Sequence, residues 1–476
     1  MTFNRFLQAS FLFALSCVAS AETVETERTA EQQKALDLYS KLISYRSAVG
    51  HKQVLPMATL LAEQFRAGGF PAEDVHLLPV DDTAALVVRF RGTANSSLKP
   101  ILFMAHMDVV DALPKDWERD PFTLLEEDGY FYGRGTMDNK AGVNNLTTVF
   151  LRLKKEGFVP ERDLILAFSG DEETTGITIK TLIKDHRELI DAEFAINSDG
   201  GGGSLAKGSD SSSRKAKAAS FNVQTAEKTY MTFALETKNR GGHSSAPRSD
   251  NAIYQLAAAL KKLSQFKFPV RSDETTKLYF ERSAELQSGQ VAKAMKRFAK
   301  DPTDQWASDY LAAKPEYVGV TRTTCVATLL EAGHAENALP QSAKATVNCR
   351  VWPDESLESV IQHLENAVDD EGVSVSLADG YTSSPPSPLN PLIMSAIESV
   401  VHKRHPDIPV IPYMAPYFTD GKFTRGAGIP TYGVGGLFLG SEDARAHGLN
   451  ERVPVWSFFE SQLYWYDLMV TLAGKK

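Results

Sequence analysis

Five side chains of the types that bind divalent metal ions lie directly after predicted strands or in turn-rich loops: His106, Asp138, Glu173, Asp199 and His447. Apolar runs at 101–105, 164–169 and 194–197 predict buried strands, and each runs into one of these residues. Because the carboxyl ends of neighbouring strands in an α/β sheet share one edge, we expect these side chains to gather there. A single His or acidic residue after a strand is usually a surface residue. The repetition is what predicts a metal site.

Alternating strands and helices predict the sheet that positions these side chains. Helical patterns cover about 32–69, 139–156 and 178–189, and a further strand is predicted at 85–90. Asp138 ends the turn-rich stretch before the second of these helices, and His447 follows a glycine-rich segment at 433–440. This alternation predicts an α/β fold with helices on both faces of the sheet.

A different pattern between residues 222 and 380 predicts an inserted second domain. Its order is strand, helix, two strands, helix, strand, at 230–237, 251–263, 325–330, 345–351, 357–368 and 373–377. This order is typical of a small α+β sheet of the split βαβ, ferredoxin-like kind. A charged, largely helical insertion interrupts it at about 268–315, and the α/β pattern resumes after a proline-rich turn. We therefore expect a main domain in two parts, 22–221 and 381–476, with the second domain at 222–380.

Residues 1–21 have the pattern of a cleavable signal peptide. Arg5 gives a short positive start, 6–18 is an apolar run, and Ala19-Ser20-Ala21 is a small-residue cleavage pattern. The expected location is therefore the bacterial periplasm or the extracellular space. No later segment has the roughly 18 uninterrupted apolar residues of a membrane span.

Composition narrows the classes of partner. The chain has 476 residues, which is too long for one ordinary core, and its formal net charge is −9 without a long basic block. Nucleic acid is therefore not an expected partner. Cys325 and Cys349 lie in predicted strands, and an exported protein could carry them as a disulfide or as two buried thiols.

The stretches around the candidate ligands resemble a known family. The matching segments are 105–110, 133–140, 169–175, 197–202 and 446–451. They are similar to the two-zinc exopeptidases and amidohydrolases that include bacterial glutamate carboxypeptidase, aminoacylase, carnosinase and succinyl-diaminopimelate desuccinylase. The resemblance implies a hydrolase that cleaves an amide bond of small peptides or N-acyl amino acids.

The resemblance also implies roles for individual residues. His106 and Asp199 would bind one ion, Glu173 and His447 the other, and Asp138 both. Asp108 would accept the N–H of the His106 ring, and Glu172 would be the general base that takes a proton from the attacking water. The expected ions are zinc, with cobalt or manganese as substitutes, because a mixed set of His and carboxylates suits them.

Three residues of the inserted domain match substrate-binding positions of the family. His243, in Gly241–Pro247, resembles a His that reaches the scissile carbonyl, in dimeric members from the other subunit. Asn337 resembles a substrate-binding Asn, and Arg350 an Arg that grips a substrate carboxylate. The resemblance therefore implies a lid or dimerisation domain and a homodimer.

Two other classes of protein have similar sequence features. A binding protein could retain the fold without the chemistry, but it would have no need for Glu172 beside five ligands. A two-metal phosphoesterase uses similar ligands, but the Asn and Arg of the inserted domain favour a carboxylate-bearing substrate. Among amide hydrolases, the pattern favours a carboxypeptidase or dipeptidase, with an N-acyl-amino-acid hydrolase as the alternative.

Overall fold

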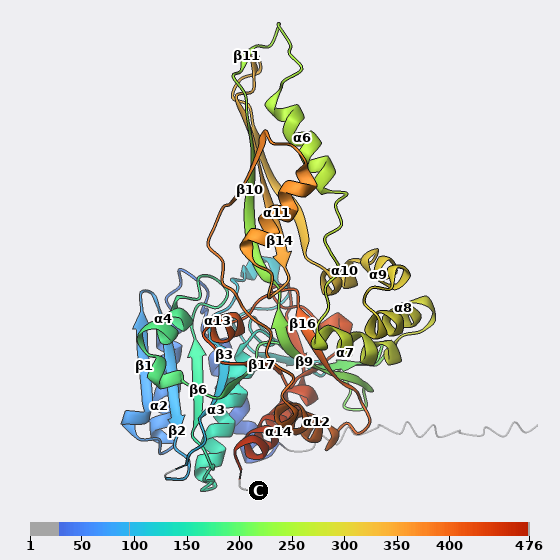
Figure 1. Cartoon of the computed structure of the whole chain (residues 1–476). Helices are drawn as coiled ribbons and strands as arrows, with labels where there is room; N and C mark the ends of the chain where they lie inside the picture. Colours follow the sequence, from blue (N-terminus) through green and yellow to red (C-terminus); the bar gives the residue numbers. More distant parts are fainter. Residues whose placement is uncertain (1–27, 95, 475–476) are drawn as a thin grey trace, which may run out of the picture.

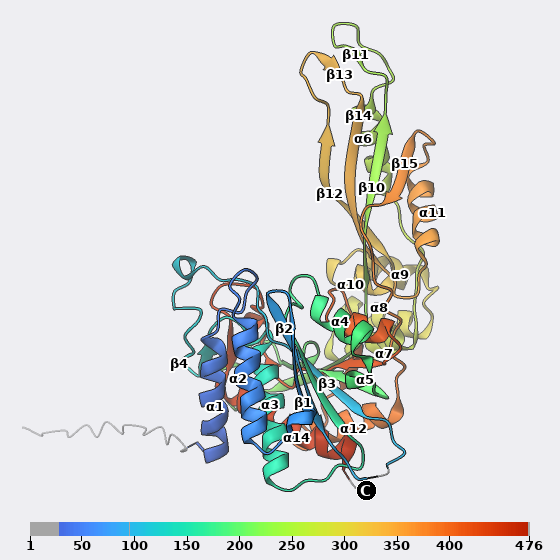
Figure 2. The same ribbon diagram turned by 90° about the vertical axis from the view of Figure 1, so that its left-hand side faces the viewer.

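The computed structural model describes residues 28–94 and 96–474. An α/β body carries a smaller sheet that projects away from it (Figure 1, Figure 2). The predicted signal peptide, residues 1–21, lies outside the described residues. Within these ranges, no helix has both the length and the apolar character needed to cross a membrane.

The body is built on a ten-stranded sheet in the order β1-β2-β6-β3-β7-β17-β9-β8-β18, with β16 paired to β9. The central strands β6, β3 and β7 are parallel to one another, and every residue of all three is buried. Burial on both faces explains why these strands are continuous apolar runs. The bounds are β1 Val75–Val80, β2 Thr83–Phe90, β3 Ile101–His106, β6 Leu164–Ser169, β7 Phe194–Asn197, β8 Gly202–Leu205, β9 Ala218–Glu227, β16 Val410–Ala415, β17 Thr431–Gly433 and β18 Phe438–Leu439.

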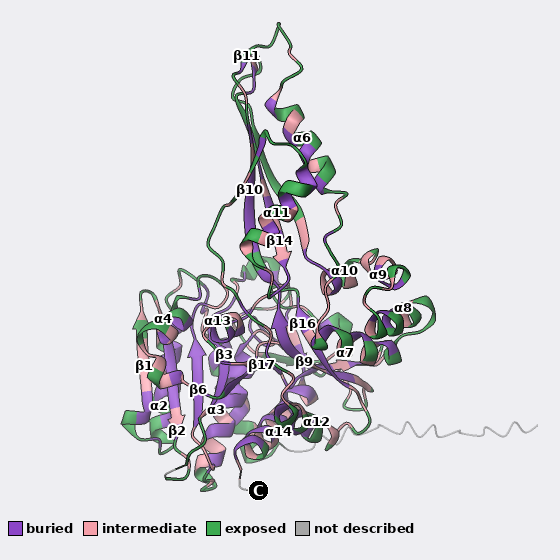
Figure 3. Cartoon of the chain, viewed as in Figure 1, coloured by how far each residue is buried: buried purple, intermediate pink, exposed green. Residues whose placement is uncertain are grey.

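Helices cover both faces of this sheet, and the predicted α/β fold is confirmed (Figure 3). Successive strand residues point to opposite faces. Phe103 therefore belongs to the apolar cluster that α2, α3, α12 and α14 contribute to, whereas Leu102 belongs to the cluster that α4, α5 and α13 contribute to. The predicted helical stretch 32–69 is two helices, α1 and α2, separated by a turn at 44–53. The bounds are α1 Ala30–Ile43, α2 Val54–Ala67, α3 Lys140–Lys155, α4 Ile177–Asp185, α5 Arg187–Ile190, α12 Pro391–His402, α13 Gly421–Gly426 and α14 Val455–Ala473.

Two short sheets complete the strands. One, in the order β19-β5-β4, lies in the loops before Asp138 and after His447, and the other pairs β11 with β13. The bounds are β4 Leu125–Glu127, β5 Tyr130–Tyr132, β19 Arg452–Pro454, β11 Gly242–His243 and β13 Ala338–Leu339.

The projecting sheet has four antiparallel strands in the order β12-β14-β10-β15, and β12 is an edge strand. Its chain order is strand, helix, two strands, helix, strand. Helices α6 and α11 pack on its buried face through apolar side chains such as Leu256 and Leu364. We call this unit, Thr229–Leu377 without its helical insertion, the lid. The bounds are β10 Thr229–Lys238, α6 Ala252–Leu263, β12 Thr324–Ala332, β14 Ser342–Val351, α11 Leu357–Val368 and β15 Val373–Leu377.

The helical insertion of the lid lies beside the body rather than over the β12 edge. Its first helix packs against β16, where Arg282 donates to the main-chain oxygen of Val410. The apolar residues Val326, Leu329 and Leu330 of β12 are accordingly 60%, 63% and 64% exposed. The insertion comprises α7 Glu274–Ser283, α8 Gly289–Lys300, α9 Gln305–Ala312 and α10 Pro315–Thr321.

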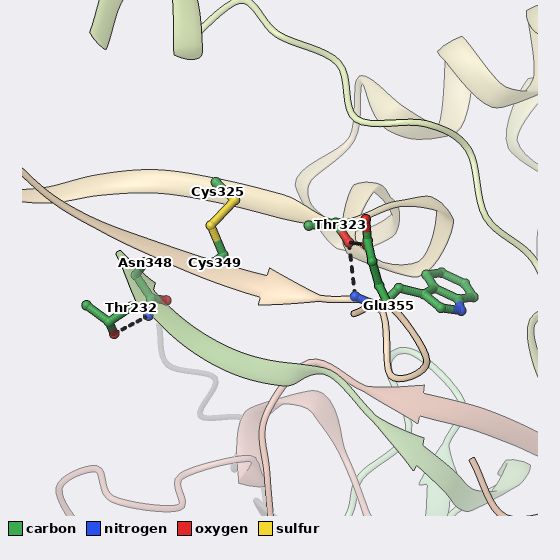
Figure 4. Close-up of a disulfide and its surroundings, with 7 residues drawn as sticks. Thr232, Thr323, Cys325, Asn348, Cys349 and Glu355 are labelled. Carbon is green, nitrogen blue, oxygen red and sulfur yellow. Dashed lines mark hydrogen bonds between the residues drawn. A yellow bond between two sulfur atoms is a disulfide. The ribbon is translucent and has the colours of Figure 1, made fainter. Parts of the chain in front are cut away.

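Cys325 and Cys349 form a disulfide between β12 and β14 (Figure 4). The two residues lie directly opposite each other in the register of these strands. The disulfide decides between the two alternatives that the sequence left open. It fastens the exposed edge strand to the rest of the lid.

Candidate metal centre

The structure brings all five predicted ligands to one point. Together with the predicted base Glu172, they form three groups whose donor atoms lie within 4.8 Å of one another: His106–Asp138–Asp199, Asp138–Glu173–His447 and His106–Glu172–Glu173. They meet because β6, β3 and β7 are parallel neighbours, so their carboxyl ends share one edge of the sheet. Asp138, just before α3, and His447, in the loop before β19, complete the cluster.

Asp138 lies between the two imidazole rings. Its Oδ1 is 2.8 Å from Nε2 of His106, and its Oδ2 is 3.1 Å from Nε2 of His447. The same His447 atom lies 3.0 Å from Glu173, and His106 Nε2 lies 3.9 Å from Asp199. One carboxylate therefore faces both ligand groups, one oxygen to each, which is the geometry of a ligand shared by adjacent ions.

Asp108 orients its neighbours in two ways. Its main-chain oxygen lies 3.1 Å from Nδ1 of His106, closer than its carboxylate at 3.4 Å. The nearest acceptor from Asp108 is thus its main-chain carbonyl. A proton on Nδ1 leaves the Nε2 lone pair facing Asp138. The Asp108 carboxylate instead accepts the N–H groups of Glu172 at 3.1 Å and Glu173 at 3.0 Å, and so fixes the loop that carries them.

Glu451 organises the loop that delivers Asp138, a role that sequence reasoning missed. This buried carboxylate accepts the N–H groups of Gly135, Met137 and Asp138 at 2.7–3.0 Å, and it pairs with Arg134 at 2.7 Å. It lies within the matched stretch 446–451 beside His447. That position was the available signal for a structural role.

The cluster contains more acidic than basic groups. Burial, with the nearby charge of Asp138, raises the pKa of Asp199 well above its usual range, and burial likewise raises the pKa of Glu172. Hydrogen bonds with Asp138 and Glu173 raise the pKa of His447 to about 10. Burial alone would lower the pKa of His106, but its contacts with Asp108 and Asp138 outweigh that effect and raise it.

The excess of acidic groups indicates what the cluster could bind. Four carboxylates, those of Asp138, Glu172, Glu173 and Asp199, lie together with only two imidazoles, so positive charge would stabilise their ionised forms. Divalent cations supply such charge, and the mixed oxygen and nitrogen donors are ligands that they accept. The residues present therefore fit divalent metal ions.

The predicted substrate residues of the lid do not join this cluster within one chain. His243 is exposed on β11 at the far tip of the lid, where the Ser244 N–H donates to the Asn337 main-chain oxygen at 3.0 Å (Figure 1). His243 and Asn337 are therefore close to each other and remote from the ligands.

Arg350 lies at the root of the lid. Its guanidinium carbon is 4.7 Å from the centre of the Tyr230 ring, and that ring is 6.4 Å from Phe418 of the body. Burial lowers the pKa of Arg350. This side chain therefore lies at the junction of the lid and the body.

Two features are typical of metal-dependent hydrolases. Groups of His and carboxylate ligands lie at the strand ends of an α/β sheet, and a small α+β domain is inserted in the chain. Residues 102–471 match the model of Peptidase family M20/M25/M40, and the chain belongs to this family. It is therefore a hydrolytic enzyme.

Known proteins similar in sequence to this chain cover most of its length. The human N-fatty-acyl-amino acid synthase/hydrolase PM20D1 is 28% identical over 393 residues, 79% of this chain and 74% of that protein. The probable carboxypeptidase S-like 2 of Dictyostelium discoideum is 30% identical over 396 residues, 81% and 74% of the two chains. The structure of an M20 family metallo-carboxypeptidase from Sulfolobus solfataricus superposes with a TM-score of 0.65 at 19% identity, covering 93% and 99% of the chains.

Proposed function

We propose that the protein hydrolyses the amide bond between an acyl group and an amino acid that carries a free carboxylate. Dipeptides, peptides cleaved at the C-terminus and N-acyl amino acids share this chemistry. The proposal rests mainly on the geometry of the cluster. Asp138 faces both ligand groups, and a carboxylate oxygen of Glu172 lies within 4.8 Å of a ring nitrogen of His106. The relatives named above, an acyl-amino-acid hydrolase and a carboxypeptidase-like protein, support the same substrate class.

In this proposal the cluster would take two zinc ions, with cobalt or manganese as working substitutes. His106 and Asp199 would hold one ion, Glu173 and His447 would hold the other, and Asp138 would contribute to both. When bound, the ions polarise the scissile carbonyl and lower the pKa of the attacking water. Glu172 takes a proton from that water as its oxygen bonds to the carbonyl carbon, and gives the proton to the leaving nitrogen as the C–N bond breaks.

The substrate class is tested with a library of dipeptides, N-acyl amino acids and their C-terminal amides, each incubated with zinc-loaded protein and separated by liquid chromatography. We expect cleavage of members with a free carboxylate and little cleavage of the matched amides. A guanidinium such as that of Arg350 can donate two parallel hydrogen bonds to a carboxylate, and an amide cannot accept both. Equal cleavage of acids and amides would contradict the proposed substrate class.

We further propose a homodimer in which the lid's β12 edge pairs with its copy. The exposed apolar residues Val326, Leu329 and Leu330 on an unpaired edge support such an interface. With the lid in this position, His243 on β11 is too far from the metal ligands of its own chain to reach a substrate bound there. It would therefore act on the other subunit's site.

Mixing two inactive variants tests action across the dimer. Glu172→Gln lacks the base, and His243→Ala lacks the lid imidazole. In an equal mixture half of the dimers are mixed, and each has one complete site, so about a quarter of wild-type activity should return. No recovery despite demonstrated subunit exchange, or a monomeric mass in solution, would rule this arrangement out.

We also propose that the protein is exported, on the pattern of residues 1–21. The Cys325–Cys349 disulfide supports this proposal, because such bonds persist in oxidising compartments. N-terminal sequencing of the mature protein should begin near Glu22, and retention of Met1 would contradict it.

A further inference from the structure

A buried ion pair joins the two chain segments that connect the lid to the body. Glu227 is the last residue of β9, two residues before the lid begins at Thr229, and it lies 2.6 Å from the Arg425 guanidinium of α13. Both side chains are 1% exposed. Arg425 also donates to the Ser384 hydroxyl at 3.1 Å, on the segment that returns from the lid. The metal chemistry described above does not use this pair.

A continuous series of hydrogen bonds leads from this pair to a metal-binding loop. The Thr419 hydroxyl donates to Glu227 Oε1 at 2.7 Å and accepts from the Asn197 side-chain amide at 3.2 Å. Asn197 in turn accepts the Asp199 N–H at 3.2 Å and donates to the Asp199 main-chain oxygen at 3.3 Å. Both polar groups of the Asp199 backbone are therefore held by one side chain, which is itself oriented by Thr419.

Thr419 has no unused hydrogen-bonding capacity. Its hydroxyl also accepts the Gly421 N–H at 3.0 Å, so its one proton and both lone pairs are occupied. Thr419 is 1% exposed and Asn197 is 2% exposed, so water cannot replace these bonds. Loss of the hydroxyl would leave an amide donor, a backbone N–H and a buried carboxylate without this partner.

We propose that Thr419 and Glu227 are positioning residues for Asp199, and that they set the affinity of the ion bound by His106, Asp138 and Asp199. The inference rests on the proposed function, since it concerns one of its two ions. A carboxylate ligand binds well only when its direction is fixed, and loss of outer partners of a metal site typically weakens metal binding about 10- to 100-fold.

Thr419→Val removes the hydroxyl and keeps the shape of the side chain. In a competition titration with a chromophoric chelator, we expect one of two zinc ions to bind about 10- to 100-fold more weakly and the other to be unchanged. Activity should return when free zinc exceeds the weakened Kd. A general structural defect would not respond to zinc in this way.

Two further variants keep the test specific. Thr424→Val makes the same change at a buried threonine of α13. Its hydroxyl donates to the Gly421 main-chain oxygen or bonds to the Thr431 hydroxyl and contacts none of Glu227, Thr419 and Asn197, so this variant should bind both ions normally. Thr419→Ser keeps the hydroxyl and should also bind both. Wild-type zinc affinity in Thr419→Val, or equal weakening in Thr424→Val, would overturn the inference. A wild-type protein that binds no divalent ion would instead overturn the proposed function, and this inference with it.

Discussion

Glu172→Gln is expected to lower kcat by about 10²- to 10⁴-fold while both ions remain bound. The substitution preserves size and shape but removes the carboxylate that accepts the proton of the attacking water. Glu172 is held for this role by its N–H, which donates to the Asp108 carboxylate at 3.1 Å. The change should appear in kcat rather than KM, because proton transfer occurs only in the transition state.

Glu173→Gln is the matched control, since it makes the same chemical change one residue away. The Glu173 carboxylate lies 3.0 Å from His447 and belongs to the group with Asp138. This variant should lose affinity for one ion, as measured by elemental analysis after dialysis, and regain activity at high zinc. If Glu172→Gln lost the ion and Glu173→Gln kept both, the roles of base and ligand would be exchanged.

The α/β fold and the clustering of the five ligand residues could be predicted because they depend on local sequence. The strands β3, β6 and β7 are unbroken apolar runs, and parallel pairing places the residues after them at one edge. This topology accounts for His106, Glu173 and Asp199. Asp138 and His447 lie in loops outside these strands, and the family resemblance is what placed them in the cluster.

Other parts of the site could not be predicted, because they depend on contacts between distant segments. Glu451 acts on the Asp138 loop some 310 residues earlier in the chain, and Thr419 reaches Asn197 across 222 residues. The spacing of the two cysteines in the sequence could not show whether they pair. Their pairing depends on the register of β12 and β14, which places Cys325 opposite Cys349. The distance of His243 from the ligands likewise depends on how the lid projects.

Removal of the metal ions is expected to abolish hydrolysis, the largest effect that we predict. Without cations, the partly buried Asp138, Asp199 and Glu173 have only imidazolium groups and protons to offset their charge, and nothing polarises the substrate carbonyl. Zinc, cobalt or manganese should restore activity to the chelated protein, whereas magnesium should restore little. Nitrogen ligands such as His447 suit the first three ions better.

Zinc titration of the chelated protein, with elemental analysis and turnover measured on the same samples, tests the central claim most directly. We expect turnover of an N-acyl amino acid or dipeptide to be absent at zero ions per chain and to reach its maximum at two. Full turnover in a sample shown to hold no metal would contradict it.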